Sequence, residues 1–333
     1  MKRTLTILAI LFLVPFNAQP QDLGTILKKV SPEYAINYLQ PFASSFGMNL
    51  NSGFIGGYAP SSYSKIPIHP HFYVGFKAVG TFLTDVDKVF SLAYNAPALD
   101  NAGNSIIDPG TGQVVNAVYQ ANNVPTVFGN TSAPVIHGTY YLGGAQQSTQ
   151  MTTIGGIWDT KISPLAMPQI GVGTIYGTDL MIRALPKIKI GDYGEIGYFG
   201  FAVRHSVSSY LKKIPFELAA QFGWQTFGVT SPTSGNKFID ANAWMVNVQA
   251  FKRIKIVGIY GGIQYENFTM DVNYVYNEPG TNKPIPVAFS ENGANKFRFM
   301  AGANVYIGPV VFNLDLAIAN KFILSAGLGG VVF

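Results

Sequence analysis

Residues 308–333 read GPVVFNLDLAIANKFILSAGLGGVVF, and this stretch decides the fold class. From Val310 to Ile318 every second residue is large and apolar, and the residues between them include Asn313 and Asp315. Successive side chains of a β-strand point to opposite faces, so the segment is predicted to be a strand with one apolar and one mostly polar face. A second, glycine-rich strand follows at 321–333 after a short turn.

The composition of the chain is that of a membrane protein or of an unusually sticky soluble one. Only 12% of its 333 residues are charged, 14% are aromatic and the mean hydropathy is +0.21, whereas about 25% of the residues in soluble domains are charged. A membrane-spanning helix needs about 20 consecutive apolar residues, and the one comparable run, 7–16, is shorter. The alternative is a closed β-barrel, because it pairs every backbone amide and carbonyl within the bilayer.

The first residues have the layout of a secretory signal peptide. Lys2 and Arg3 precede an apolar core, and a polar exit follows near Ala18, so we predict a signal peptide at 1–18. The chain has no Cys, which excludes disulfides, a lipoprotein anchor and thiolate metal sites. Export without Cys favours the outer membrane of a Gram-negative bacterium, with its lipid and lipopolysaccharide as surroundings. The small net charge gives no reason to expect a nucleic acid partner.

Alternation of the same kind recurs along the chain and predicts twelve strands. They are expected at 47–58, 71–82, 86–94, 169–176, 178–185, 193–208, 214–227, 242–250, 255–273, 296–308, 310–318 and 321–333. The predicted fold is therefore all-β: a transmembrane antiparallel β-barrel over 47–333 with a large extracellular insertion at 95–165. Within the insertion, QVVNAVYQ and APVIHGTYYL would add a hairpin and make fourteen strands.

The lengths of the connections orient this barrel. The predicted short links, at 83–86, 177, 209–213, 252–254 and 308–309, all fall on one side. The long links, at 95–165, 229–239 and 276–294, fall on the other. Outer-membrane barrels have short periplasmic turns and long extracellular loops, so the side with the short links is assigned to the periplasm.

Residues 19–46 lack the period-two pattern and have helix-compatible spacing of their apolar residues. Ser31, Pro32 and Glu33 are typical of a helix start with Pro at the first position. We expect two short helices here, which either plug the barrel or lie on the periplasmic surface. The candidate plug residues are Tyr34, Tyr38 and Leu39.

Several stretches carry a family resemblance: QIGVGTIYGTDLMIRALPKIKIG, FAVRHSVSSYLKKIPFELAAQFGWQTF, VPTVFGN and YLQPFASSFGMNLNSGF. They resemble an uncharacterised, domain-of-unknown-function family of Gram-negative outer-membrane barrels, which is distantly similar to the long-chain fatty-acid (FadL-type) transporters. The resemblance implies passage or capture of a small hydrophobic molecule. The Asn-Pro-Ala motif of the transporters' N-terminal hatch is not found here, so fatty-acid transport is expected by analogy only.

Charged residues on the polar strand faces are the candidate functional site. The parity of the predicted strands points eight of them into the barrel: Asp179, Arg183, Arg204, Glu217, Glu266, Lys296, Arg298 and Asp315. One interpretation is a lumen whose charges select what passes or binds. The other is a lumen filled with ion pairs, because both signs occur and a charge facing lipid costs about 2 to 4 kcal/mol at the midplane.

The main hypothesis is passage or capture of a small molecule, with no catalytic residue, metal or cofactor. The first alternative is a structural or adhesive barrel that acts through its extracellular loops. The second is a barrel hydrolase using His205, Ser206 and Asp179; neighbouring residues on a strand point to opposite faces, so His205 is poorly placed to activate Ser206. Phe333 resembles the C-terminal aromatic residue recognised by the barrel-assembly machinery.

Overall fold

The computed structural model describes residues 31–57, 68–189, 195–211, 214–230, 235–277 and 283–332. The predicted signal peptide and Phe333 lie outside these ranges. None of the helices in the described ranges is long and apolar enough to cross a membrane.

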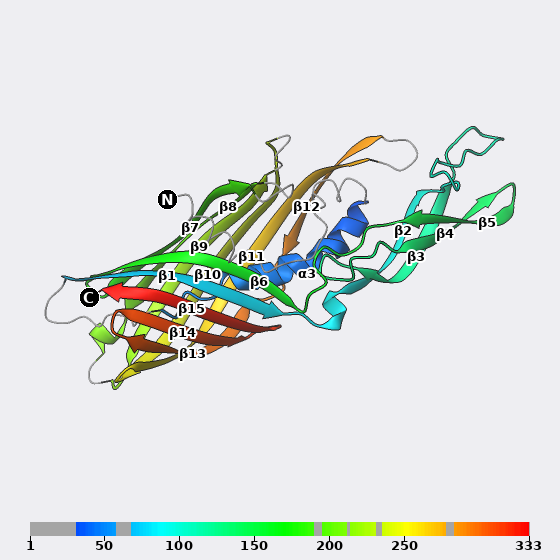
Figure 1. The fold of residues 1–333 in the computed structure, drawn as a ribbon. Coiled ribbons are helices and arrows are strands. Elements are labelled where there is room, and N and C mark those ends of the chain that lie inside the picture. The colour runs from blue at the N-terminus through cyan, green and yellow to red at the C-terminus, as the bar shows by residue number, and fades with distance from the viewer. Residues whose placement is uncertain are drawn as a thin grey trace.

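Ten strands close into an antiparallel barrel (Figure 1). In order around the wall they are β1 (Ile68–Phe82), β6 (Ile162–Ile175), β7 (Thr178–Lys189), β8 (Glu195–Ser206), β9 (Glu217–Thr230), β10 (Lys237–Ile254), β11 (Val257–Asn277), β13 (Phe297–Ile307), β14 (Val310–Ile318) and β15 (Phe322–Val332). The seam joins β1 to β15, where Phe72–Thr81 pair with Val332–Ile323 without a register shift.

The outward face of the barrel is apolar and the inward face is largely polar. In β14, Leu314 is 52% exposed whereas its neighbour Asp315 is 4% exposed. Phe72 on β1, Ile170 on β6 and Phe299 on β13 are likewise exposed on the outside. The alternation predicted from the sequence is therefore present, with a belt of apolar side chains around the barrel.

The barrel has two strands fewer than predicted. Residues 47–50 end a helix and 51–57 continue without strand structure, so no strand forms there. Gly47 lies in the last turn of that helix, and a Cβ there would lie 2.5 Å from the Phe268 ring, so the glycine serves close packing inside the barrel. The predicted strand at 86–94 does form in part, but it belongs to a different sheet.

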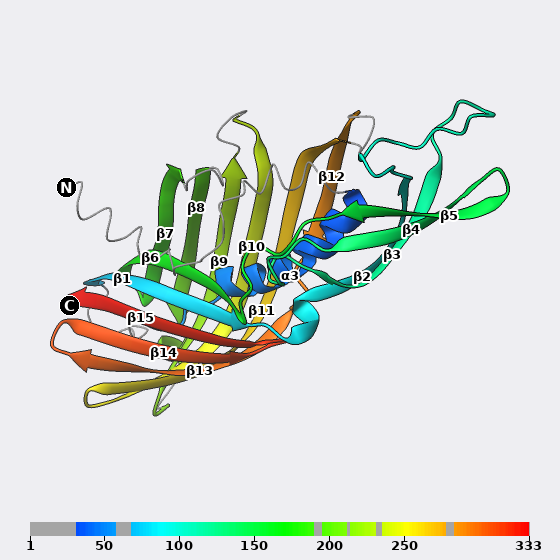
Figure 2. The same cartoon turned by 45° about the vertical axis from the view of Figure 1, so that its right-hand side comes forward.

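That sheet is built by the insertion and has four strands: β2 (Val89–Pro97), β3 (Asn116–Pro125), β4 (Val135–Leu142) and β5 (Ala145–Thr152). The segments QVVNAVYQ and APVIHGTYYL supply β3 and β4, which pair with each other outside the barrel, so the fourteen-strand alternative is wrong. The sheet reaches beyond one end of the barrel (Figures 1 and 2).

The short turns gather at one end of the barrel, which we call the turn end. Two-residue turns at Gly177, Ile256 and Pro309 join consecutive strands there, and Gly177 has a φ of 75°, a conformation that suits glycine. Residues 207–216, with the 3₁₀ helix η2 (Ser208–Tyr210), connect β8 to β9 at the same end.

The opposite end, the loop end, carries the sheet β2–β5 and the links 190–194, 231–236 and 278–283, together with the three-residue turn 319–321 between β14 and β15. The predicted short link at 83–86 is wrong, because it lies at the loop end, where η1 (Asp85–Asp87) leads from β1 into β2. A short link after an apolar strand has the same local sequence pattern at the turn end and at the loop end, so the sequence alone did not show at which end 83–86 lies.

A further strand, β12 (Pro284–Asn292), extends the barrel wall at the loop end. The long strand β11 pairs with β13 over Val257–Tyr265 and with β12 over Thr269–Asn277, antiparallel in both cases. β12 and β13 therefore form one strand interrupted at 293–296. The interruption resets the alternation of side chains, and this places Lys296 outside the barrel although Arg298 points inward.

One helix, α3 (Pro32–Leu50, 19 residues), replaces the two short helices predicted. Ser31 caps it, since the Tyr34 amide donates to the Ser31 hydroxyl at 3.3 Å, and Pro32 stands in the first turn as expected. Pro41 lies inside the helix without ending it. Figures 1 and 2 show α3 within the wall of strands, running from the sheet β2–β5 toward the turn end.

Candidate functional site

The lumen of the barrel is occupied by residues 32–57, which we call the plug. Its first residues contact the loop end, since the Tyr34 hydroxyl donates to the Ile154 carbonyl at 2.9 Å. Its last described residue lies toward the turn end, where the Gly57 amide donates to Asn304 at 3.2 Å. The plug therefore runs through the lumen from one end to the other.

At the loop end the plug packs against the base of the sheet β2–β5. The Tyr38 hydroxyl donates to the Gly155 carbonyl at 3.0 Å, and the Phe42 ring contacts Phe128 and Trp158 with centroids 6.3 and 5.8 Å apart. Burial raises the pKa of Tyr34 to about 12, so its hydroxyl stays protonated and keeps donating at physiological pH. The helix thus joins the sheet to the lumen.

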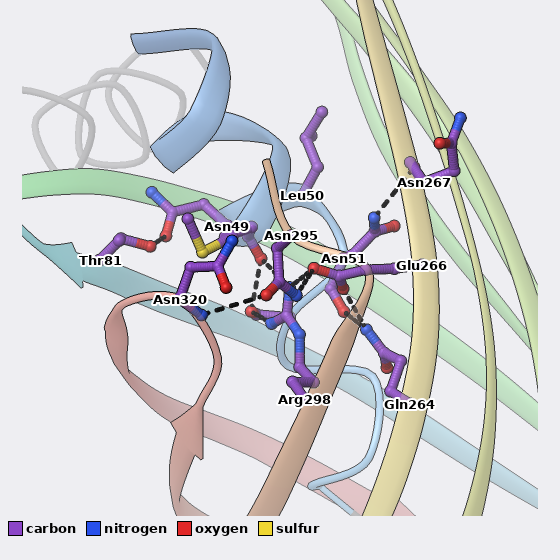
Figure 3. A network of polar contacts seen from close by, with 12 residues as sticks. Asn49, Leu50, Asn51, Thr81, Gln264, Glu266, Asn267, Asn295, Arg298 and Asn320 are labelled. Carbon is purple, nitrogen blue, oxygen red and sulfur yellow. Dashed lines mark hydrogen bonds and ion pairs between the residues drawn. The ribbon is translucent and has the colours of Figure 1, made fainter. Parts of the chain in front are cut away.

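In the middle of the barrel the plug meets an ion pair from the wall (Figure 3). Arg298 donates to Glu266 at 2.5 Å, to the Met48 carbonyl at 3.0 Å and to the Ser52 hydroxyl. Asn295, from the interruption before β13, also donates to Glu266, at 2.6 Å. Both charges are buried and have charge-assisted hydrogen bonds, which is the arrangement that makes a buried pair tolerable.

A second cation holds the plug on the opposite wall. Arg183 is fully buried, donates to the Ser52 carbonyl at 2.9 Å and to Gln169 at 2.9 Å, and stacks on the Phe54 ring with 3.5 Å from guanidinium carbon to centroid. Gln225 adds a bond of 2.6 Å to the Leu50 carbonyl. These contacts satisfy the carbonyls that the end of α3 leaves free.

Nearer the turn end, a buried lysine lies among polar side chains. Lys77 donates to Asn313 at 2.7 Å, and Asn313 donates in turn to Asp315 at 3.1 Å. Asp315 also accepts from Ser325 at 2.9 Å and from the Tyr260 hydroxyl. Lys77 and Asp315 therefore belong to one hydrogen-bonded network through Asn313.

A fourth charged group joins β7 and β8. Arg204 donates twice to one carboxylate oxygen of Asp179, at 2.7 and 2.9 Å, and His71 Nε2 lies 3.6 Å from the other. Ser206 is buried on the inward face, whereas His205 contacts Thr178 and Tyr210 at 2.8 and 3.0 Å at the barrel edge. The pair considered for a hydrolase, His205 and Ser206, is therefore not brought together.

Little empty space remains among these groups. The cavity beside Ser52, Arg298 and Asp315 has a volume of about 10 Å³, which is room for one water at most. A second, beside Ser44 and Glu266, has a volume of about 0 Å³. Each of these two cavities beside the plug is too small to hold a solute.

The eight predicted lumen residues divide into three groups. Six lie buried inside the barrel: Asp179, Arg183, Arg204, Glu266, Arg298 and Asp315. Glu217 is half-buried near the turn end. Lys296 is exposed and donates to Asn267 on the outside, which contradicts its assignment to the lumen. The plug candidates Tyr34, Tyr38 and Leu39 are buried, at the loop end of α3 rather than among the charges.

Sequence reasoning missed Lys77 and the neutral amides of the lumen. Lys77 has the inward parity of its strand, opposite to Phe76, so alternation alone identifies it. The missed amides share that parity on their strands: Gln169, Gln221, Gln225, Asn247, Gln249, Gln264, Asn304 and Asn313. A search restricted to charged residues overlooks them, although Gln225 and Gln264 donate to the Leu50 and Asn51 carbonyls of the plug.

Nearly the whole chain matches one protein family. The family described as "Family of unknown function (DUF6588)" matches residues 1–330. The chain belongs to the DUF6588 family. No curated protein sequence matches this DUF6588 chain at a significant level.

Solved structures with partial similarity to this DUF6588 protein are outer-membrane proteins. A loop-deletion mutant of OmpT from Vibrio cholerae aligns over 80% of this chain and 100% of its own, at 9% identity and a TM-score of 0.25. OccK1 (OpdK) of Pseudomonas aeruginosa aligns over 79% and 98%, at 10% identity and 0.22. The outer membrane channel DcaP of Acinetobacter baumannii aligns over 82% and 100%, at 10% identity and 0.19. These scores are low, so the barrel assignment depends on the strand pairing of this chain.

Proposed function

We propose that this DUF6588 protein is a closed barrel of the Gram-negative outer membrane that works through the sheet β2–β5, which it holds outside the cell. The observation that carries the proposal is the plug, which is bonded to the wall at the loop end, in the middle and near the turn end. The apolar belt supports a position in the bilayer, and the short turns at one end support a periplasmic turn end.

A closed lumen favours the interaction alternative over passage. Solute passage needs a continuous void, and the cavities beside the plug have volumes of about 10 and 0 Å³. The sheet, by contrast, is firmly held: Lys321, at the turn before β15, pairs with Asp87, and Thr126 donates to the Asp87 carbonyl at 2.6 Å. A held sheet presents a fixed surface to a partner.

Passage is a second candidate, as a state in which the plug has moved. Two guanidinium nitrogens in the lumen, Arg183 Nη2 and Arg298 Nε, are buried without a hydrogen-bond partner among the described atoms. The residues around them are mixed, with Asp315 and Ser325 beside apolar residues such as Met300 and Ile323, so the two guanidiniums are the groups that would bind a solute. A polar, anionic solute therefore fits this lumen better than the hydrophobic molecule that the family resemblance implies.

Reconstitution into planar bilayers tests closure. The expected result is no conductance steps from the wild-type protein across the voltage range that the bilayer tolerates. Regular steps from the unaltered chain would overturn the proposal and favour passage.

Labelling of intact cells tests the position of the sheet. The chain has no Cys, so a single introduced thiol reports one site. Gln147→Cys in β5 is expected to react with a membrane-impermeant maleimide, and Pro309→Cys at the turn end is expected to react only after lysis. The reverse result would place the sheet in the periplasm and refute its proposed role.

A further inference from the structure

The outer edge of the sheet β2–β5 is an unprotected strand. β5 pairs with β4 over eight consecutive residue pairs, Leu142↔Ala145 to Val135↔Thr152, without a register shift. The turn between them is Gly143-Gly144, with φ of 59° and 81°. In a two-residue hairpin the pair next to the turn, here Leu142 and Ala145, is hydrogen-bonded, and bonded and non-bonded pairs then alternate along the strands. Gln146, Ser148 and Gln150 belong to non-bonded pairs, so their backbone amides and carbonyls point away from β4.

These backbone groups have no partner among the described residues. Gln146, Ser148 and Gln150 are all exposed, and the backbone hydrogen bonds outside the regular strands do not include them. On the opposite face of β5, the Thr149 side chain is buried. Its hydroxyl accepts from the Leu99 amide at 3.1 Å and donates to the Leu99 carbonyl at 2.7 Å. The edge is therefore straight, fixed in place and open.

Proteins usually block such edges with charges, prolines or bulges, and this chain does so elsewhere. The opposite edge strand of the sheet, β2, has a register shift between Phe90 and Leu92 and ends in Pro97. β12, which pairs only with β11, contains Pro284 and Pro286. β5, with the sequence AQQSTQMT, has no charge, proline or bulge.

We propose that β5 pairs antiparallel with β5 of a second copy of this chain, so that the two sheets join into one of eight strands. This inference deepens the proposed function, on which it rests, by naming the partner. Two identical edges meet across a twofold axis, and an axis at Ser148 sets Gln146 opposite Gln150 of the second copy, twice. Side-chain amides both donate and accept, so these pairs match themselves.

The absence of charge is what favours a second copy over a foreign strand. Like charges directly opposite one another destabilise a strand pair, and a homotypic pairing brings every charged residue near its own kind. The exposed residues of β5 avoid this, since they are Gln, Ser and Thr with one Ala and one half-buried Met.

The experiment uses the full chain in lipid nanodiscs that hold one barrel each, with donor and acceptor dyes on separate preparations. Wild-type protein is expected to show energy transfer that increases with concentration. Ser148→Lys alone and Ser148→Glu alone are each expected to weaken self-association about tenfold or more, because like charges meet at the axis. An equal mixture of the two variants is expected to recover it.

Gln147→Lys is the matched control. It introduces the same charge one residue away, on the other face of the strand and away from the twofold axis, so it is expected to leave association within about twofold of wild type. Absence of self-association in the wild type, or failure of the Lys and Glu variants to recover when mixed, overturns the inference. Binding of a foreign strand to β5 without self-association overturns it as well. None of these outcomes affects the bilayer and labelling tests of the closed barrel.

Discussion

Arg298 is the residue whose replacement should loosen the plug most directly. Its side chain is 1% exposed and donates to two groups of the plug, the Met48 carbonyl and the Ser52 hydroxyl. Arg298→Met removes both bonds but would leave Glu266 buried without its cation, which is strongly destabilising. The variant to study is therefore Arg298→Met combined with Glu266→Gln.

The structure gives the size of the effect. A hydrogen bond from a charged donor contributes about 1.5 to 3 kcal/mol, so the loss of two such bonds weakens the hold on the plug by about 3 to 6 kcal/mol. With 1.4 kcal/mol for each factor of ten, the population of displaced plug rises about 10² to 10⁴-fold.

Amide hydrogen exchange of residues 41–57 in nanodiscs measures this population, because exchange of a protected segment follows its opening equilibrium. Exchange of these residues is expected to accelerate by the same factor, while that of β9 and β10, which contribute no bond to Arg298, stays unchanged. Lys296→Met is the matched control, since Lys296 is two residues away and donates to Asn267 on the outside. Unchanged exchange in the double variant would refute the assignment of Arg298 as a principal contact of the plug.

Three further perturbations have defined outcomes. Burial alone would raise the pKa of Asp87, but the bonds of its carboxylate to Lys321 and to Thr84 outweigh burial and lower the pKa. The carboxylate therefore stabilises the fold fully at a pH well above the ordinary pKa of about 3.9, and this stabilisation is lost as the pH falls below that value. Protease cleavage between the barrel and the sheet should accordingly increase below about pH 4. Gly47→Val places a Cβ 2.5 Å from the Phe268 ring, and such overpacking typically costs about 1 to 3 kcal/mol, which should lower the thermal midpoint of the barrel. Leu314→Lys puts a charge on the lipid-facing belt, and we expect a loss of about 2 to 4 kcal/mol in the free energy of unfolding from vesicles.

Each of these outcomes has its own control. Lys321→Met should remove the acid-dependent step in proteolysis, and a step that persists would show that another group causes it. Gly330→Val, at a position where φ is outside the left-handed region and the nearest heavy atom to a Cβ lies 3.9 Å away, should leave the thermal midpoint unchanged, because it adds the same side chain without overpacking. Val86→Lys, in the exposed 3₁₀ turn at the loop end, should leave the unfolding free energy in vesicles unchanged; a loss equal to that of Leu314→Lys would contradict the position of the belt.

The wall of the barrel could be predicted because each strand borders two different surroundings. β14 alternates between the exposed outer face and the lumen at every residue, and this alternation can be seen without knowing which strands pair with β14. The same reasoning placed Arg298 and Asp315 inside. It failed at Lys296, because an interruption in a strand leaves no local mark of its effect on parity.

The number of strands could not be predicted, because alternation does not tell which sheet a strand joins. The sheet β2–β5 has one packed and one exposed face, so β4 alternates in burial as strictly as a barrel strand does. Residues 47–57 were misassigned for a related reason, since a segment inside the barrel is buried on all sides. Its glycines are needed because side chains far away in the sequence, such as Phe268 and Tyr260, leave no room for a Cβ. Such contacts are set by tertiary structure alone.

The position of the plug in the chain has a consequence for assembly. The seam joins the first barrel strand to the last, Phe72 to Val332, and the plug precedes both. The bond that Arg298 donates to the Met48 carbonyl spans 250 residues, a separation of the kind that slows folding. Because the plug lies inside a wall that closes only when β15 pairs with β1, we expect the last hairpin to complete the barrel around a plug that is already in place.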